Sequence, residues 1–219
     1  RLKLRQGDME LKSAITNISH DLRTPLTAIC GYLDLLEQET LPQRAENYLN
    51  IIRERTDAMR ALTEELFHYS VISLKEEELK IEKVCVNDIL EQSLAGFYGV
   101  FTNKNIVPDI KITEVRVMCL LDKSALRRIF DNILSNAARY TEGDLKVKLF
   151  SDGRITFSNH ASGLDRVQAK RLFERFYMVE SAKNSTGLGL SIARLLTEKM
   201  GGDIKADYID GELIIQIEV

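Results

Sequence analysis

Three reactive side chains lie close together in residues 19–26, which read Ser-His-Asp-Leu-Arg-Thr-Pro-Leu. The imidazole of His20 is a nitrogen nucleophile near neutral pH. The neighbouring carboxylate of Asp21 can hold the ring in one tautomer and accept its proton. Thr24 follows His20 at a spacing of four residues, so in a helix its hydroxyl lies on the same face. The segment therefore predicts nucleophilic chemistry at His20, and the alternative is a structural histidine on a helix surface.

A second polar group consists of Asn132 and Asn136, which are four residues apart in a segment expected to be helical over residues 122–139. Both amides then project from one helix face. Amides offer hydrogen-bond donors and acceptors to phosphate oxygens, and their carbonyl oxygens are ligands for Mg²⁺. The apolar residues of the segment supply a separate buried face, so we expect the asparagines to face a cleft. A solvated polar face is the alternative.

Two glycines, Gly187 and Gly189, come directly before a helix expected over residues 191–200. Glycine leaves backbone N–H groups accessible there, and the positive end of a helix attracts phosphate. Aromatic residues upstream, among them Phe173 and Phe176, are expected to anchor the intervening segment. The chain has no Gly-x-x-x-x-Gly-Lys-Ser/Thr loop and no Gly-x-Gly-x-x-Gly fingerprint, so neither a P-loop nor a protein-kinase-like nucleotide site is expected.

The spacing of apolar residues over residues 1–74 predicts a helical hairpin that would carry His20. Two seams repeat every three or four positions. They comprise Leu11, Ile15, Ile18, Leu22, Leu26, Ile29, Leu33 and Leu36, and then Tyr48, Ile52, Arg55, Met59, Leu62, Leu66 and Tyr69. Pro25 is expected to bend the first helix, and Pro42 lies in the break between the two. One hairpin cannot bury both seams well, so we expect a homodimeric four-helix bundle.

Residues 75–219 are expected to form an α+β sandwich. Strands are expected at residues 79–84, 106–112, 115–120, 145–150, 154–158, 204–208 and 213–219. Turns near residues 113–114, 152–153 and 210–211 would join the last six strands into three hairpins. Asn87-Asp88 would cap a helix reaching about residue 98, and Asp122 would cap the helix over residues 122–139. Residues 159–186 are expected to be rich in loops.

Composition excludes several classes of function. A net charge of −3 over 219 residues favours neither nucleic acid nor an anionic membrane surface as a partner. No apolar run is long enough to span a membrane, and no signal peptide opens the chain. The three cysteines are far apart, which fits a reduced cytosolic compartment and neither a disulfide framework nor a zinc site. Because the chain starts at Arg1 in an amphipathic segment, we expect a fragment of a longer protein.

The order of the polar segments resembles that of the sensor histidine kinases of two-component systems. Residues 19–26 are similar to the family's phospho-accepting histidine box, and residues 131–141 to its N box. Residues 155–164 fall where the family has its first glycine box. Residues 171–177 and 185–194 resemble its F box and second glycine box. The resemblance implies a dimerisation and phosphotransfer hairpin over residues 1–74, and a catalytic domain of the Bergerat (GHKL) ATP-binding type over residues 75–219.

The resemblance also implies roles for individual residues. His20 would be phosphorylated from ATP and would pass the phosphoryl group to an aspartate of a response-regulator receiver domain. Asp21 would orient and deprotonate the ring, Thr24 would position a water that dephosphorylates the regulator, and Asn136 would hold Mg²⁺. The implied ATP-binding residues are Asn132, Asn136, Arg139, Tyr140, Asn159, Gly163, Leu164, Phe176, Thr186, Gly187, Leu188, Gly189 and Leu190. Residues 178–185 would form a lid over the nucleotide. The chain would be the cytoplasmic portion of a membrane-anchored sensor.

Two residues depart from the family's Asp-x-Gly-x-Gly pattern in the first glycine box. Asn159 replaces the aspartate that accepts a hydrogen bond from the adenine amino group, and Ala161 replaces the first glycine. Asn159 keeps an acceptor but loses its charge, which corresponds to about a tenfold loss of affinity. Ala161 would be strained if its φ were positive. His160, between them, is interpreted as structural, with a nucleotide contact as the alternative.

These departures leave two other functions open. The chain could act mainly as a phosphatase of its regulator, with a weakened adenine pocket. It could also be a non-catalytic dimeric scaffold, which would bind no Mg·ATP and carry an inert His20.

Overall fold

The computed structural model describes residue 18 and residues 21–74, 79–177 and 187–219. The chain divides into two compact units, Arg1–Glu77 and Glu78–Val219, which are described separately below. Among the described helices, none combines the length and the apolar character needed to cross a membrane.

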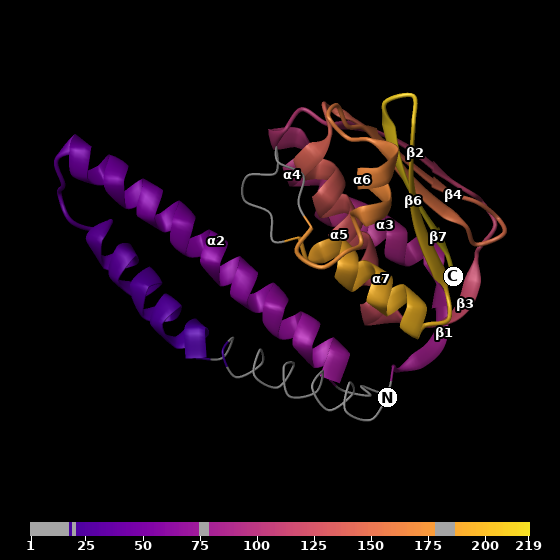
Figure 1. The fold of residues 1–219 in the computed structure, drawn as a ribbon, viewed down its shortest axis with the longest axis horizontal. Coiled ribbons are helices and arrows are strands. Elements are labelled where there is room, and N and C mark those ends of the chain that lie inside the picture. The colour runs from indigo at the N-terminus through magenta and orange to yellow at the C-terminus, as the bar shows by residue number, and fades with distance from the viewer. Residues whose placement is uncertain (1–17, 19–20, 75–78, 178–186) are drawn as a thin grey trace. The chain divides into compact units, whose positions relative to one another are not determined.

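The first unit contains an antiparallel helical hairpin, as the two seams predicted. Residues 21–36 form one helix, which continues on both sides of Pro25, and α2 (Gln43–Leu74) forms the other (Figure 1). Near the turn, Arg53 of α2 pairs with Asp34 at 2.9 Å and with Glu37 at 2.6 Å. Farther along, the guanidinium of Arg23 lies 4.8 Å from the ring centroid of Phe67. Charged and cation–π contacts therefore join the two helices at both ends of the hairpin.

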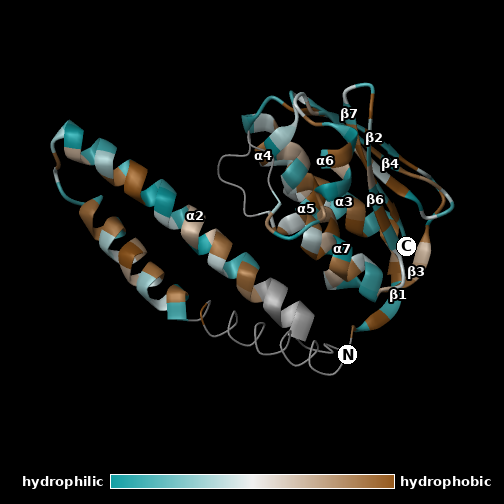
Figure 2. Ribbon diagram, in the orientation of Figure 1, coloured by the Kyte–Doolittle hydropathy of each residue, from teal (hydrophilic) through white to brown (hydrophobic). Residues whose placement is uncertain are grey.

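Only part of each apolar seam is buried within the hairpin. Leu26 and Leu33 are 4% and 5% exposed, whereas other apolar side chains on both helices stay accessible. Figure 2 shows that hydrophobic residues recur along both helices. The exposed residues of the two seams are Ile18, Leu22, Ile29, Leu36, Tyr48, Ile52, Met59 and Leu62. An apolar stripe of this length on a hairpin is the surface that a second hairpin would cover in a four-helix bundle. These exposed seams support the predicted homodimer, which stays a prediction.

The second unit is a two-layer α+β domain whose helices cover one face of a sheet (Figure 1). The five-stranded sheet has the order β2 (Val107–Ile112), β4 (Asp144–Leu149), β5 (Ile155–His160), β7 (Glu212–Glu218) and β6 (Asp203–Ile209). A separate pair consists of β1 (Ile81–Cys85) and β3 (Met118–Asp122). The helices are α3 (Val86–Gly96), α4 (Tyr98–Asn103), α5 (Lys123–Tyr140), α6 (Arg166–Arg171) and α7 (Gly189–Lys199).

Alternating burial along the strands shows which face of the sheet meets the helices. Leu145, Val147 and Leu149 of β4 are buried, and the residues between them are half-buried. The same alternation continues in β5 and β7, so one apolar face packs under the helices and the other is open to solvent.

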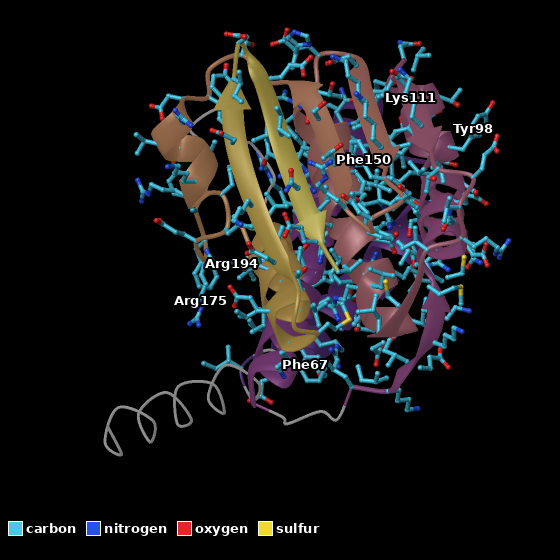
Figure 3. All side chains as sticks on the ribbon, turned by 90° about the vertical axis from the view of Figure 1, so that its right-hand side faces the viewer. Phe67, Tyr98, Lys111, Phe150, Arg175 and Arg194 are labelled. Atoms are coloured by element: carbon cyan, nitrogen blue, oxygen red, sulfur yellow. The ribbon has the colours of Figure 1, made fainter. Side chains whose placement is uncertain are left out.

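At the two edges of the domain, Tyr98 and Lys111 lie opposite Arg175 and Arg194 (Figure 3).

Two of the three predicted hairpins are confirmed, and the first is wrong. β4 pairs antiparallel with β5, and β6 with β7, around the expected turns. The strands expected at residues 106–112 and 115–120 belong to different sheets: β2 runs parallel to β4, and β3 pairs antiparallel with β1. The segment between β2 and β3 is therefore a crossover from one sheet to the other.

Asn87 explains how that crossover is held, and its predicted role as a helix cap is wrong. Its amide nitrogen donates to the carbonyls of Thr113 at 2.9 Å and Val115 at 3.1 Å. Its carbonyl oxygen accepts from the N–H of Val117 at 2.9 Å. Helix α3 starts after Cys85 without a side-chain cap, because the buried amide of Asn87 is used on the crossover instead.

Asp122 caps α5, as predicted. Its Oδ1 accepts from the N–H of Ala125 at 2.9 Å and from the hydroxyl of Ser124 at 2.6 Å, and its Oδ2 accepts from the N–H of Lys80 at 2.8 Å. Burial opposes the charged form, but these hydrogen bonds hold the pKa of the Asp122 carboxyl below its ordinary value. A short helix that the sequence analysis missed, α6, begins with a capping box formed by Asp165 and Gln168.

We predict that Asp122→Ala lowers the free energy of unfolding by about 1–2 kcal/mol at pH 7, because α5 loses its cap and the chain around Lys80 loses an acceptor. Since the folded-state pKa lies below the unfolded one, this contribution is present above the ordinary aspartate pKa and is lost as the pH falls through the lowered value. Urea unfolding at several pH values measures both effects. Asp109→Ala, which removes an exposed carboxylate paired with Lys111, is the control and should change stability little.

Candidate nucleotide site

Asn132 and Asn136 lie on the side of α5 that faces away from the core, because the opposite side of the helix is buried. Leu126, Ile129, Phe130, Ile133 and Leu134 have no measurable exposure. The ring of Phe130 lies 6.0 Å from that of Phe157 on β5, which fixes α5 against the sheet. Asn132 and Asn136 are half-buried on the remaining face, as the spacing predicted.

Asn132 faces the glycine that starts α7. A Cβ added to Gly189 would lie 3.5 Å from Asn132 Oδ1. The Nδ2 atom of Asn132 is buried and has no hydrogen-bond partner among the residues that the structure describes. A buried amide without a partner is costly, and an anionic oxygen beside the first turn of α7 would satisfy it. Asn132 and Gly189 therefore fit the phosphate end of a bound nucleotide.

Backbone contacts hold together the two flanks of residues 178–186. The N–H of Phe176 donates to the carbonyl of Gly187 at 3.1 Å. Gly187 has φ +67°, and a Cβ there would lie 2.8 Å from the backbone of Phe176. Phe176 itself has φ +59°. Only glycine allows this approach, so the requirement for glycine at position 187 is both conformational and steric. Leu188 is buried, and Leu190 begins the buried side of α7.

The segment corresponding to the first glycine box, residues 155–164, begins in β5 and continues into the loop after it. Asn159, near the end of β5, is buried, with 4% of its surface exposed. Its Nδ2 donates to the carbonyl of His160 at 2.8 Å, which leaves Oδ1 as the atom able to accept from a ligand. Ala161 is not among the described non-glycine residues with positive φ, so the strain considered for it does not arise. Its N–H donates to the carbonyl of Gly211 at 3.1 Å, and its carbonyl accepts from the hydroxyl of Tyr208 at 3.2 Å.

The remaining predicted site residues are placed as follows. Gly163 has φ +88° with open space around it, and Leu164 is half-buried. Arg139 is exposed and Tyr140 half-buried in the last turn of α5. In the first unit, Asp21 and Thr24 are exposed on the first helix. His20 and Thr186 lie outside the described residues.

A carboxylate that the sequence analysis missed lies beside this box. Asp144 accepts from the N–H of His160 at 3.0 Å, and its Oδ2 lies 2.9 Å from His160 Nδ1. Burial works against the ionised Asp144, but hydrogen bonds from His160 and Thr141 hold its pKa below the ordinary value. Hydrogen bonding to Asp144, and then its charge, raise the pKa of His160. The only signal in the sequence was an acidic residue opening the strand after the N box.

Comparisons with known proteins place both units. Residues 10–73 match the model of the His Kinase A (phospho-acceptor) domain, and residues 121–216 match that of the histidine kinase-, DNA gyrase B- and HSP90-like ATPases. The chain is 33% identical over 208 residues to the sensor histidine kinase YcbM of Bacillus subtilis, covering 90% of this chain and 67% of that protein. It is 29% identical to the sensor protein VanSC of Enterococcus gallinarum, covering 98% of this chain and 62% of that protein.

Solved structures show the same fold. ShkA, solved at full length in complex with AMPPNP, superposes with a TM-score of 0.74 at 26% identity, over 93% of this chain and 45% of ShkA. The histidine kinase AdeS of Acinetobacter baumannii superposes with a TM-score of 0.64 over 91% of this chain and 96% of AdeS; at 22% identity this likeness concerns the fold alone. The chain belongs to the sensor histidine kinases of two-component systems. It carries their phospho-acceptor domain and their GHKL-type ATPase domain.

We predict that Gly187→Ala lowers the affinity for Mg·ADP by about tenfold or more, because the new Cβ separates residue 187 from the backbone of Phe176. Gly201→Ala is the matched control: φ is positive there too, at +83°, the Cβ meets nothing within 4 Å, and the residue lies outside the candidate site. It should therefore show the cost of backbone strain alone, about 1–3 kcal/mol. Calorimetric titration with Mg·ADP and thermal unfolding compare the two variants. Equal losses of affinity would contradict the steric argument.

Proposed function

We propose that this chain phosphorylates itself on His20 from Mg·ATP and transfers the phosphoryl group to an aspartate of a response-regulator receiver domain. The observation that carries the proposal is the amide of Asn132: its Oδ1 lies toward Gly189 at the start of α7, and its buried Nδ2 has no partner among the described residues. An unpartnered amide donor beside the N-terminus of a helix is suited to a phosphate oxygen.

The adenine end of the nucleotide would lie against the loop that follows β5. The free Oδ1 of Asn159 accepts a hydrogen bond from the exocyclic amino group of adenine, since Nδ2 is already committed to the His160 carbonyl. Gly163 and Leu164 bound the pocket. A neutral acceptor gives this contact less strength than a carboxylate would give.

The phosphate end would lie between α5 and α7. Asn132, Arg139 and Tyr140 would line it from α5, and Phe176 and the backbone of Gly187, Leu188, Gly189 and Leu190 would lie beside it. Thr186, outside the described residues, is assigned to the same end by the family resemblance. The carbonyl oxygen of Asn136, one helical turn after Asn132, is a suitable ligand for Mg²⁺. When bound, the metal supplies neutralisation of charge on the phosphates.

The chemical step is an in-line displacement at the γ-phosphorus. Nε2 of His20 forms the new N–P bond while the bond from phosphorus to the bridging oxygen of ADP breaks, and ADP leaves with that electron pair. Asp21 holds the ring tautomer that presents Nε2 and takes up the Nδ1 proton as positive charge develops. The chain contributes mainly positioning and electrostatic stabilisation, as expected for phosphoryl transfer.

Partners follow from the same family. A second copy of the chain would cover the exposed seams of the hairpin to give a four-helix bundle, and the receiver domain would dock beside His20. In the full-length protein, these units would form the cytoplasmic part of a membrane-anchored sensor.

A second candidate activity, dephosphorylation of the regulator, is favoured by two observations. Thr24 is exposed on the first helix at a spacing of four residues from His20, and the Thr24 hydroxyl would orient a water toward a phospho-aspartate. Asn159 is a neutral residue where the family pattern has an aspartate, which would weaken the adenine contact.

For the kinase, we predict acid-labile, alkali-stable label on the chain after incubation with γ-phosphate-labelled ATP and Mg²⁺. His20→Gln should abolish the label. Asp21→Asn should slow labelling by about a hundredfold, because an amide cannot take up the proton. Asp57→Asn, on an exposed carboxylate of α2 paired with Arg60, is the control. Binding of Mg·ATP without labelling would favour the phosphatase, and no binding at all would favour the scaffold.

For the phosphatase, we predict that Thr24→Ala reduces regulator dephosphorylation by about tenfold or more while autophosphorylation stays within about twofold of the parent. Thr27→Ala is the matched control. The Thr27 hydroxyl, on the same helix, already donates a hydrogen bond to the carbonyl of Arg23 at 2.9 Å and is therefore not expected to orient a water. The decay of a phosphorylated receiver domain measures the effect. If Thr24→Ala lowered both activities equally, Thr24 would have a structural role in the helix and would not orient the attacking water.

A further inference from the structure

Asp144 lies where three parts of the candidate site meet: the end of α5, the start of β4 and the end of β5. Thr141, which directly follows α5, donates from its hydroxyl to Asp144 Oδ1 at 3.0 Å and also to the Asp144 carbonyl. Through Thr141 the carboxylate is tied to the helix that carries Asn132 and Asn136.

The same carboxylate clamps the residue after Asn159. The N–H of His160 donates to both Asp144 oxygens, at 3.0 and 3.2 Å, and the ring Nδ1 of His160 lies 2.9 Å from Oδ2. The clamped residue in turn holds Asn159, since the His160 carbonyl accepts from Asn159 Nδ2 at 2.8 Å. A continuous set of hydrogen bonds therefore runs from Asp144 through His160 to the amide proposed to read adenine.

We propose that Asp144 is a positioning residue for adenine recognition, acting through His160 to fix which end of the Asn159 amide faces the nucleotide. The inference rests on the proposed function of Asn159. With His160 held, Asn159 Nδ2 is kept on the His160 carbonyl and Oδ1 is presented to the ligand. Without the clamp, the amide is free to turn and to present a donor, which does not match the amino group of adenine.

The charges around His160 support a clamp that strengthens when His160 is protonated. Asp144 and Lys146 face it from β4, Glu212 from β7, and Glu142 from the turn after α5. The hydrogen bond and charge of Asp144 raise the pKa of His160, with a smaller contribution from Glu212, while burial and Lys146 oppose them. The charged pair is thus fully formed below the ordinary histidine pKa and is lost as the pH rises through the raised value.

The same side chains do not make a convincing metal site. Ligand atoms of Asp144, His160 and Glu212 lie within 4.8 Å of one another. However, the amine of Lys146 already pairs with Glu212, and both oxygens of Asp144 already accept from His160. A cation would have to break these contacts and compete with an ammonium, so the cluster is assigned to positioning.

The test compares the affinities of Asp144→Asn and the parent for Mg·ADP and Mg·GDP, measured by calorimetric titration on the whole chain. We expect Asp144→Asn to bind Mg·ADP about five- to tenfold more weakly and Mg·GDP about as the parent does, because the phosphate contacts remain. Asp203→Asn, an exposed carboxylate on β6 paired with Lys205, should change neither affinity. Equal losses for both nucleotides would indicate a structural role and overturn the proposal, and so would unchanged Mg·ADP binding.

A double-mutant cycle tests whether Asp144 acts through Asn159. If it does, Asp144→Asn should cost little further affinity for Mg·ADP in the background of Asn159→Ala. Additive losses would contradict the proposed route.

His160→Gln provides an independent variant should Asp144→Asn fail to fold, since it keeps the backbone N–H that donates to Asp144. The ratio of the parent's affinity for Mg·ADP to that of His160→Gln should fall as the pH rises through the raised pKa of His160, because only the parent loses the charged pair with Asp144. Comparing the two chains at each pH cancels the ionisation of the nucleotide itself. A constant ratio of affinities across pH 6–9 would overturn the role of the ring. If the parent binds no nucleotide at any pH, the proposed function itself fails; if the parent binds and the variants match it, only the positioning role fails.

Discussion

The burial of one side of α5 is the constraint on which the rest of the second unit depends. Five of its side chains have no measurable exposure, and Phe130 meets Phe157 on β5 at 6.0 Å. With the helix unable to roll, Asn132 is held beside the start of α7, and Asn136, one turn later, lies on the same face of α5. The same aromatic contact fixes the strand whose end carries Asn159. One packed layer thus sets the spacing between the two halves of the proposed nucleotide site.

Close backbone approach then shapes the phosphate end. Gly187 lets the chain lie directly on Phe176, and a side chain there would occupy space that the Phe176 backbone now fills. Gly189 lies beside the amide of Asn132, where an added Cβ would make an ordinary contact at 3.5 Å from Oδ1. The two flanks of residues 178–186 are therefore fixed to each other by the hydrogen bond from Phe176 to Gly187, whatever conformation the intervening residues adopt.

Sequence patterns predicted the elements whose signals are local. The seams of the hairpin, the Asp122 cap and the turns at 152–153 and 210–211 all depend on neighbours in the chain, and all are confirmed. The pairing of β2 with β4 was missed because a parallel partner far along the chain leaves no local mark. Asn87 looked like a cap, but it lies beneath a crossover that periodicity cannot reveal. Likewise, the residue types of Asn132 and Gly189 suggested a phosphate site, whereas Asp144 became visible only once β4 and β5 were paired.

The replacement of the family's aspartate by Asn159 is consistent with the groups around it. Asn159 is 4% exposed, and its Nδ2 donates to the His160 carbonyl. A carboxylate in that orientation would set an oxygen against that carbonyl, beside the charges of Asp144 and Glu142. Burying a further negative charge there would be costly, because the hydrogen-bond partner of the Asn159 side chain, the His160 carbonyl, is an acceptor. The amide removes this repulsion and gains a donor that holds its own orientation. In the proposed arrangement, the negative charge beside this box is on Asp144 of the neighbouring strand β4, and it acts on Asn159 through His160 without touching the ligand.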